Sequence, residues 1–145
     1  DSGRDIDVNL RGTIYCTEKY GIQPNIKAII MTASVSAHNG AEFPEYCASK
    51  GGVLAYTKNV ALRVAKYGAT CNSISAGGVI TELNAHILEN KSLWDQVMAE
   101  TLIPKWATVE EMAEWTYFLA VVNKSMTAQD VLIDNGEIAK ANFVW

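Results

Sequence analysis

Several features that would place this sequence in a specialised class of protein are scarce or missing. The 145 residues carry 12 Lys and Arg against 16 Asp and Glu, without a basic cluster, so we expect no nucleic-acid partner. No apolar run approaches the roughly 20 residues that a membrane-spanning helix needs, so we expect no membrane association. Cysteine occurs only as Cys16, Cys47 and Cys71, and histidine only as His38 and His86, without a CxxC pair or a Cys/His cluster. We therefore expect no metal site, and reduced thiols in a cytoplasmic protein.

What the sequence does contain is an alternation of helical and strand patterns. Apolar residues repeat every fourth position in residues 1–21 and predict a helix, and the nearly continuous apolar run 26–33 predicts a buried parallel strand. A capping box opens a further helix at Thr108. That helix is expected to continue to about Val122. The remaining elements are expected as a helix over 45–67, a strand over 69–75 and a strand over 130–134. This alternation indicates a parallel α/β sheet.

The segment between the first two of these strands holds the residues most suited to chemistry. Tyr46 and Lys50 are four apart, so they share one face of the predicted helix. A phenol beside an ammonium group can donate and accept a proton, because the cation favours the phenolate. Ser34 follows the apolar strand directly, where ligands bind in open α/β sheets. Ser36 is a competing choice, and we prefer Ser34 because it ends the strand.

The spacing of Tyr46 and Lys50 alone is weak evidence, because Tyr15 and Lys19 have the same spacing. That second pair lies inside a helical pattern and follows no serine-ended strand. We interpret it as part of an exposed helix face.

The order of the motifs VNLRG, IIMTAS, YCASK, NSISAGGVIT and IDNG resembles the short-chain dehydrogenase/reductase family. The resemblance covers nearly the whole chain. It implies the C-terminal half of a Rossmann-like doubly wound parallel sheet, a three-layer α/β/α fold, with residues 1–145 forming a single partial domain. Nothing before Asn9 can supply the strand, Gly-rich turn and helix that hold a dinucleotide in this family, so we expect that unit to be missing from this sequence.

The resemblance also implies a reaction, namely reversible hydride transfer between NAD or NADP and a small carbonyl or alcohol substrate. Tyr46 would be the general acid for reduction and the base for oxidation. Lys50 would assist Tyr46 and bind the nicotinamide ribose, and Ser34 would position the substrate oxygen. Asn9 in VNLRG would hold a water in a proton relay to Lys50.

By the same resemblance, the loop after the second strand would contact the nicotinamide carboxamide. Gly77, Val79 and Thr81 are its predicted cofactor-binding residues, together with Tyr46 and Lys50. The sequence departs from the family pattern at Ala76, where proline is usual. A second departure is Ala128, at a position where glycine is usual.

Several positions keep a simpler structural reading. Spacing alone favours a solvated face for Asn9 and a helix N-cap role for Thr81. The amphipathic segment 82–106 is either a core-facing helix pair or, by resemblance, a flap over the substrate. The small residues of helix 45–67 pack either on the chain's own sheet or on a second copy, as in a homodimer or homotetramer.

A second function class also stays open. Three strands without neighbours would expose an apolar sheet edge, which invites pairing. The chain could then be a non-catalytic, self-associating α/β fragment or interaction module that keeps Asn9, Ser34, Tyr46 and Lys50 without a cofactor. Binding of a dinucleotide would discriminate between the two classes.

Overall fold

Three parallel strands form the centre of the molecule. The computed structural model describes residues 3–141. Strands β1 (Ala28–Thr32), β2 (Thr70–Ala76) and β3 (Asp130–Ile133) are arranged in the order β1-β2-β3. The predicted parallel sheet is therefore confirmed, with the first strand shorter than the apolar run 26–33.

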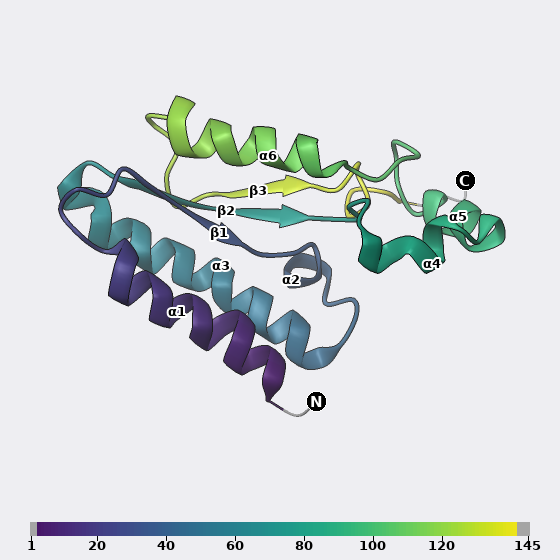
Figure 1. The fold of residues 1–145 in the computed structure, drawn as a ribbon, viewed down its shortest axis with the longest axis horizontal. Coiled ribbons are helices and arrows are strands. Elements are labelled where there is room, and N and C mark those ends of the chain that lie inside the picture. Colours follow the sequence, from purple (N-terminus) through teal and green to yellow (C-terminus); the bar gives the residue numbers. More distant parts are fainter. Residues whose placement is uncertain (1–2, 142–145) are drawn as a thin grey trace.

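Helices cover both faces of this sheet, which gives a three-layer α/β arrangement. Figure 1 shows α6 (Val109–Tyr117) above the sheet, and α3 (Pro44–Val64) below it with the N-terminal helix alongside. The Rossmann-like α/β fold class predicted from the sequence is confirmed. In the described part of the chain, no helix combines the length and apolarity needed to cross a bilayer.

The N-terminal helix runs to Gly21, as predicted, but its winding is not uniform. It consists of η1 (Ile6–Arg11), α1 (Gly12–Cys16) and η2 (Thr17–Gly21), of which the first and last have wider π-type turns. Leu10 of this helix packs against the core and lies beside Gly52 of α3. Gly21 ends the helix and lies against Ile29 of β1.

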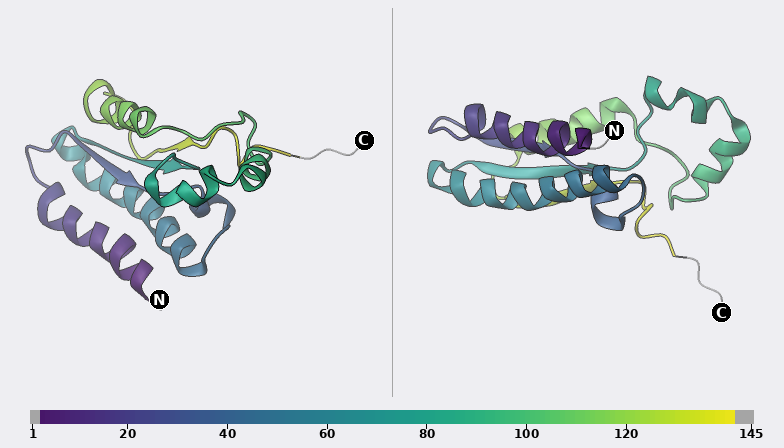
Figure 2. Two further views of the ribbon diagram at one scale, coloured as in Figure 1. Left: turned by 45° about the vertical axis from the view of Figure 1, so that its right-hand side comes forward. Right: turned by 90° about the horizontal axis from the view of Figure 1, so that it is seen from below.

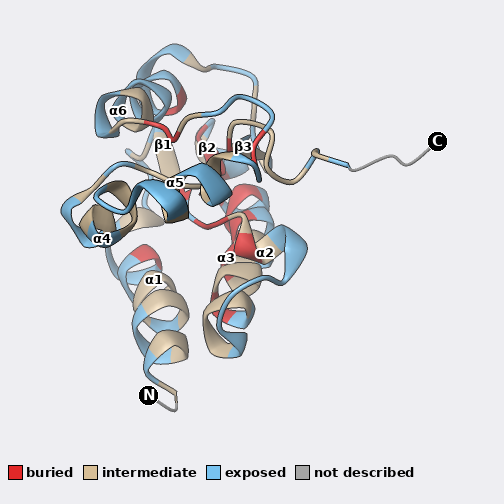
Figure 3. Cartoon of the chain, turned by 90° about the vertical axis from the view of Figure 1, so that its right-hand side faces the viewer, coloured by how far each residue is buried: buried red, intermediate tan, exposed pale blue. Residues whose placement is uncertain are grey.

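Helix α3 is the longest element and supplies one wall of the core. Pro44 stands in its first turn, where a proline costs no hydrogen bond. After Val64 a 3-10 turn, η3 (Ala65–Tyr67), leads to Gly68, whose φ of 70° reverses the chain toward β2. The core lies between α3 and the sheet, as the red segments in Figure 3 show. It comprises Met31, Ala33, Val53, Val60, Ala61, Val64, Ala69 and Cys71.

Helix α6 begins as the sequence predicts and then departs from the prediction. Thr108 accepts a hydrogen bond from the Glu111 N–H in a complete capping box, and η5 (Phe118–Val122) continues the helix. Leu119 is fully buried, whereas Trp115 and Val122 are exposed. The apolar residues that recur at helical spacing in this segment therefore form a buried stripe only in part. A sheet of only three strands covers little of the helix surface.

The segment 82–106 does not pack on the sheet. It forms η4 (Glu82–Asn84), α4 (Ala85–Leu88) and α5 (Lys91–Met98), which lie beyond the ends of the strands in Figure 1 and in the right-hand view of Figure 2. Trp94 meets Trp106 edge to face, with ring centroids 5.4 Å apart. The sequence left two predictions for this segment, a core-facing helix pair and a flap over the substrate. Its position matches that of a flap.

Candidate functional site

A cavity of about 710 Å³ opens where β1 and β2 end. Its lining combines the residues just after these strands with the start of α3 and the flap segment. This is the place in an open parallel sheet where ligands bind, because the carboxyl ends of the strands meet loops that leave room for a ligand. Most of the predicted site residues line this cavity, namely Ser34, Tyr46, Lys50, Gly77, Val79 and Thr81.

Ser34 is held rigidly at the end of β1. The chain after the strand is pinned to β2, because the Val35 N–H donates to the Ala76 carbonyl at 3.1 Å. The Ser34 side chain is buried, and its Oγ accepts the Ser36 N–H at 3.2 Å. Within the described residues this hydroxyl donates to no protein acceptor, so its proton is available to a ligand. Ser36, the competing candidate, also lines the cavity.

Tyr46 and Lys50 lie one turn apart in the first turns of α3. The Lys50 Nζ is 5.8 Å from the centroid of the Tyr46 ring and donates to the Thr32 carbonyl at 3.0 Å. Burial lowers the pKa of Lys50. An ammonium group has three N–H donors, so two remain for a ligand or a water. The arrangement places a phenol and a partly desolvated cation in one cavity.

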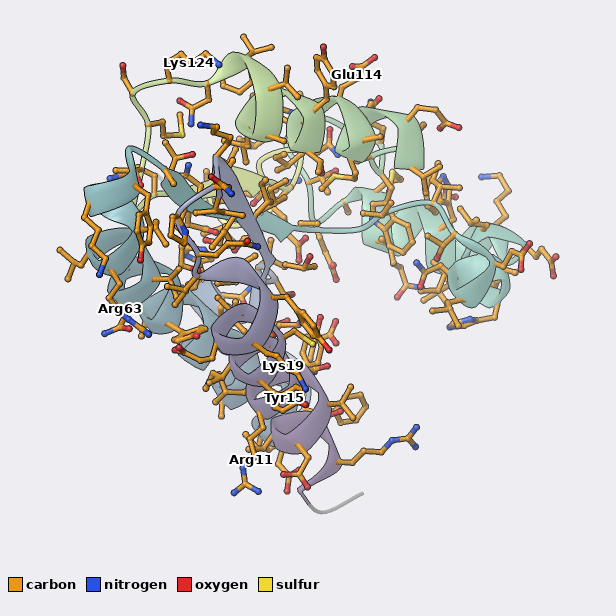
Figure 4. All side chains as sticks on the ribbon, turned by 60° about the vertical axis from the view of Figure 1, so that its left-hand side comes forward. Arg11, Tyr15, Lys19, Arg63, Glu114 and Lys124 are labelled. Carbon is orange, nitrogen blue, oxygen red and sulfur yellow. The ribbon has the colours of Figure 1, made fainter. Side chains whose placement is uncertain are left out.

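Tyr15 and Lys19, the second pair with this spacing, form a direct side-chain hydrogen bond. The Lys50 ammonium instead donates to the Thr32 carbonyl. The Lys19 Nζ donates to the Tyr15 Oη at 3.1 Å in an exposed position. Figure 4 labels both side chains on the outer surface of the N-terminal helix. The prediction of an exposed helix face for this pair is confirmed. A Tyr–Lys hydrogen bond by itself therefore does not mark the site.

Asn9 does not line this cavity. Its Nδ2 donates to the Ser49 Oγ at 3.2 Å, and the buried Ser49 hydroxyl donates to the Tyr46 carbonyl at 2.8 Å. Its backbone carbonyl accepts the Thr13 hydroxyl at 2.7 Å inside the π-type turn. Asn9 thus joins the N-terminal helix to the turn of α3 between Tyr46 and Lys50, and it faces a separate hollow beside Phe43.

The two glycines after β2 are required by the protein's own packing. A Cβ on Gly77 would lie 3.0 Å from Asp134 Cα, and one on Gly78 would lie 2.1 Å from the ring of Trp106. Both glycines therefore permit a close approach of neighbouring groups, namely Asp134 at Gly77 and Trp106 at Gly78.

Asn84 fixes the loop that contains the other two predicted cofactor-binding residues. Its Nδ2 donates to the Val79 carbonyl at 2.8 Å and to the Thr81 Oγ1 at 3.3 Å. Thr81 stands at the N-cap of η4 but makes no side-chain capping bond. Sequence reasoning missed Asn84, although its position shortly after AGGVIT was a usable signal.

Three carboxylates that sequence reasoning did not single out also line the cavity. Glu42, Glu100 and Glu137 come from the loop before α3, the end of α5 and the turn after β3. Burial raises the pKa of Glu137, and the nearby charges of Glu100, Asp134 and Glu42 raise it further. The three glutamates lie in loops without periodicity, so no pattern in the sequence brings them together.

Comparison with known proteins supports an oxidoreductase. A family model described as enoyl-(acyl carrier protein) reductase matches residues 2–137. The L-rhamnose 1-dehydrogenase (NAD(P)(+)) of Sphingomonas sp. strain SKA58 is 27% identical over 92% of this chain and 55% of its own length. The 3-oxoacyl-[acyl-carrier-protein] reductase FabG of Staphylococcus epidermidis (strain ATCC 35984) is 27% identical over 90% of this chain and 55% of its own length. The chain thus spans about half the length of the curated relatives it matches.

Solved structures give the same architecture. 4-Hydroxyisoleucine dehydrogenase complexed with NADH is 29% identical, with a TM-score of 0.83 over 94% of this chain and 58% of that one. A short-chain type dehydrogenase/reductase from Mycobacterium ulcerans is 25% identical, with a TM-score of 0.85 over 93% of this chain and 51% of that one.

Proposed function

We propose, because the chain belongs to the short-chain dehydrogenase/reductase family, that it carries the proton-transfer half of an NAD- or NADP-dependent oxidoreductase acting on a small carbonyl or alcohol. The observation that carries this proposal is that Ser34, Tyr46 and Lys50 line one cavity at the ends of β1 and β2. Relatives named as NAD(P) dehydrogenases support the cofactor class.

In this proposal Tyr46 moves the proton at the substrate oxygen. The phenol donates it when a carbonyl is reduced and accepts it when an alcohol is oxidised. Ser34 donates its free hydroxyl proton to the same oxygen, holding it in place and sharing its developing charge. Asn9 acts indirectly in this assignment: through Ser49 it contacts the turn of α3 between Tyr46 and Lys50, and from there it would support a proton relay toward Lys50.

The residues present fit the nicotinamide end of a dinucleotide. Lys50 has donors to spare for a ribose hydroxyl, and the loop of Gly77, Val79 and Thr81 is fixed against the same cavity. The bound cofactor would supply the hydride acceptor or donor. The side chains described above would orient the substrate and handle the proton.

We further propose that residues 1–145 act as one partial Rossmann-like domain that associates with further copies, as a homodimer or homotetramer. The open edge of β1 and the exposed apolar residues Trp115, Phe118 and Val122 support association. Cys16, Cys47 and Cys71 are free thiols, which supports a cytoplasmic location.

The decisive experiment compares Tyr46→Phe with Tyr15→Phe in the protein with any chain that precedes residue 1 retained. We expect Tyr46→Phe to lower kcat by about 10²–10⁴, the usual contribution of general acid–base catalysis. Binding of NAD(P)H, followed by its fluorescence, should persist in that variant. Tyr15→Phe should keep full activity, because its phenol lies outside the cavity. Turnover by Tyr46→Phe at the wild-type rate would overturn the assignment.

A further inference from the structure

The wall of the candidate site is unusually acidic for a cavity that contains a lysine. Glu42, Glu100 and Glu137 line it, against Lys50 as its only lysine or arginine among residues 3–141. Lys50 is occupied by the Thr32 carbonyl and pairs with none of the three. Among residues 5–141 no other cation forms an ion pair with them. The Lys140 ammonium donates to the carbonyls of Ala99 and Thr101, on either side of Glu100, without an ion pair to that residue. Three carboxylates thus face one lysine in the lining of the cavity, and its net charge is negative.

The charges of Glu100 and Glu42 act on Glu137. The pKa of Glu137 is raised by burial first, and then by the charges of Glu100, Asp134 and Glu42. The Asp134 carboxylate is satisfied, because it accepts the N–H groups of Gly136 and Ile138, each at 2.9 Å. Within residues 3–141 the side chains of Glu42, Glu100 and Glu137 accept no such hydrogen bonds, so their lone pairs remain available to a ligand.

Apart from Lys50, the rest of the lining is uncharged, and it combines apolar side chains with hydroxyl and amide groups. Ser34, Ser36, Thr81, Asn84 and Thr101 contribute these groups. The Ser34 hydroxyl is buried and has an unused proton, so the cavity is a ligand site on grounds independent of the glutamates. A substrate that enters it meets acceptors that favour hydrogen-bond donors and a field that opposes negative charge.

We infer that Glu42, Glu100 and Glu137 determine substrate specificity by charge, so that the site accepts alcohols or carbonyls bearing hydroxyl or ammonium donors and rejects anionic ones. This inference rests on the proposed function, because it concerns the substrate of that reaction. Charges of like sign repel across the cavity, more strongly at the half-buried Glu137 than at Glu42 and Glu100, which are exposed and screened by solvent. A hydroxyl instead gains a charge-assisted hydrogen bond from a carboxylate that it reaches. Sugars, polyols and amino alcohols have the required chemistry. Carboxylic acids and phosphate esters do not.

The test uses three secondary alcohols of one carbon skeleton that differ in charge: propane-1,2-diol, 1-aminopropan-2-ol and lactate. Their kcat/KM values are measured with NAD and NADP, and their binding is compared by saturation-transfer NMR, which needs no turnover. We expect lactate to fall at least about tenfold below the better of the other two, the scale of one like-charge contact in a partly buried site. Lactate used or bound as well as the diol would overturn the inference. So would the failure of all three compounds to bind.

Matched variants tie the discrimination to these residues. Glu100→Gln and Glu137→Gln keep the size of each side chain and remove its charge. Each should raise the lactate-to-diol ratio of kcat/KM because each removes one repelling charge, Glu137→Gln by about tenfold and the exposed Glu100→Gln by about threefold. Glu114→Gln, on the outer surface of α6 in Figure 4, makes the same change away from the cavity and should leave the ratio unaltered. A ratio that is unmoved by both cavity variants would contradict the inference.

The two proposals fail in different ways. If Tyr46→Phe stays active while the glutamine variants alter the charge preference, the proton-transfer assignment is wrong and the specificity assignment stands. If Tyr46→Phe is inactive and the glutamine variants leave the lactate-to-diol ratio unchanged, the proton-transfer assignment stands and the specificity assignment is wrong.

Discussion

The Nε2 atom of His38 lies 2.6 Å from the Oδ2 atom of Asp130. His38 belongs to α2 (Ser36–Asn39), the turn directly after Ser34, and Asp130 begins β3. The other carboxylate oxygen, Oδ1, accepts the hydroxyls of Ser73 and Ser75 at 2.6 and 2.9 Å. Asp130 thus joins all three groups, and it ties the turn that carries Ser34 to the far strand of the sheet.

Replacing Asp130 with Ala should therefore destabilise the fold. Both serines are buried and would lose their acceptor, which costs about 1–3 kcal/mol in the free energy of unfolding. Urea denaturation followed by circular dichroism measures this change. Asp130→Asn keeps one accepting oxygen and should lose less. Asp95→Ala, which breaks the exposed pair with Lys91, should change the free energy by less than about 0.5 kcal/mol. Equal losses for Asp95→Ala and Asp130→Ala would contradict this account.

Glu18 of the N-terminal helix is bound by Arg63 and Tyr56 of α3, and we call these three side chains the clamp. The clamp should make the stability of the fold fall at acid pH. Arg63, labelled in Figure 4, donates two hydrogen bonds to Glu18 at 2.5 and 2.7 Å, and Tyr56 donates a third at 2.9 Å. The bonds from Arg63, and then the one from Tyr56, lower the pKa of Glu18 to about 2. A carboxyl whose pKa is lowered on folding contributes stability above its unfolded pKa, and that contribution is lost as pH falls through the folded pKa.

Thermal melts of the wild type and Glu18→Gln between pH 7 and pH 2 should show this window. The wild type should melt higher near pH 6, and the difference should shrink between pH 4.5, the ordinary value, and about 2. Asp7→Asn, which removes an exposed pair with Arg11, should change the melting temperature little at any pH. A difference between wild type and Glu18→Gln that does not vary with pH would exclude the clamp as its cause.

The adjacent glycines of α3 should respond in opposite ways to alanine. A Cβ on Gly51 meets nothing within 4 Å, so Gly51→Ala should stabilise the helix by up to about 1 kcal/mol. A Cβ on Gly52 would lie 2.8 Å from Leu10 Cδ2, so Gly52→Ala should be at least about 1 kcal/mol less favourable. Guanidinium unfolding measures both variants. If Gly51→Ala instead destabilises the protein in a concentration-dependent way, a second copy covers α3 at that point.

Ala128 occupies a backbone conformation that suits glycine. Its φ is 61°, and the loop is held there because Asn72 bonds the Met126 carbonyl and the Gln129 N–H. Left-handed geometry costs a residue with a Cβ about 1–2 kcal/mol, and glycine would remove this cost. Glycine also has more conformational freedom in the unfolded chain, which offsets part of that gain. Ala128→Gly should therefore raise the free energy of unfolding by about 0.5–1 kcal/mol. Ala113→Gly, in the middle of α6, should lower it by about 1 kcal/mol. A lower free energy of unfolding for Ala128→Gly would contradict the conclusion that Ala128 is strained.

The sequence was sufficient for the elements and for the main cavity residues, for a physical reason. Ser34 follows one strand and Gly77 follows the next, and parallel strands bring their carboxyl ends to the same edge of the sheet. The spacing of Tyr46 and Lys50 on a helix then fixes their common face. None of this requires knowledge of the tertiary structure beyond the order of the elements.

The sequence was insufficient where a feature depends on the path of irregular chain. Glu42, Glu100 and Glu137 meet only because two loops and a short flap converge, and neither helical nor strand periodicity encodes that convergence. The exposure of Trp115 has another cause. An apolar pattern predicts which helix face seeks burial, but the number of strands beneath decides how much of it is covered.

The bond from Lys50 to the Thr32 carbonyl has a consequence for assembly. The N–H of Ala33 points toward β2, so in the alternating pattern of a parallel ladder the main-chain groups of Ile30 and Thr32 point toward the open edge of β1. Lys50 therefore occupies a carbonyl that an incoming strand would also approach. Because a carbonyl oxygen accepts two hydrogen bonds, a strand that docks on this edge would share the Thr32 carbonyl with the Lys50 ammonium. The edge of β1 and the wall of the cavity thus meet at a single backbone atom.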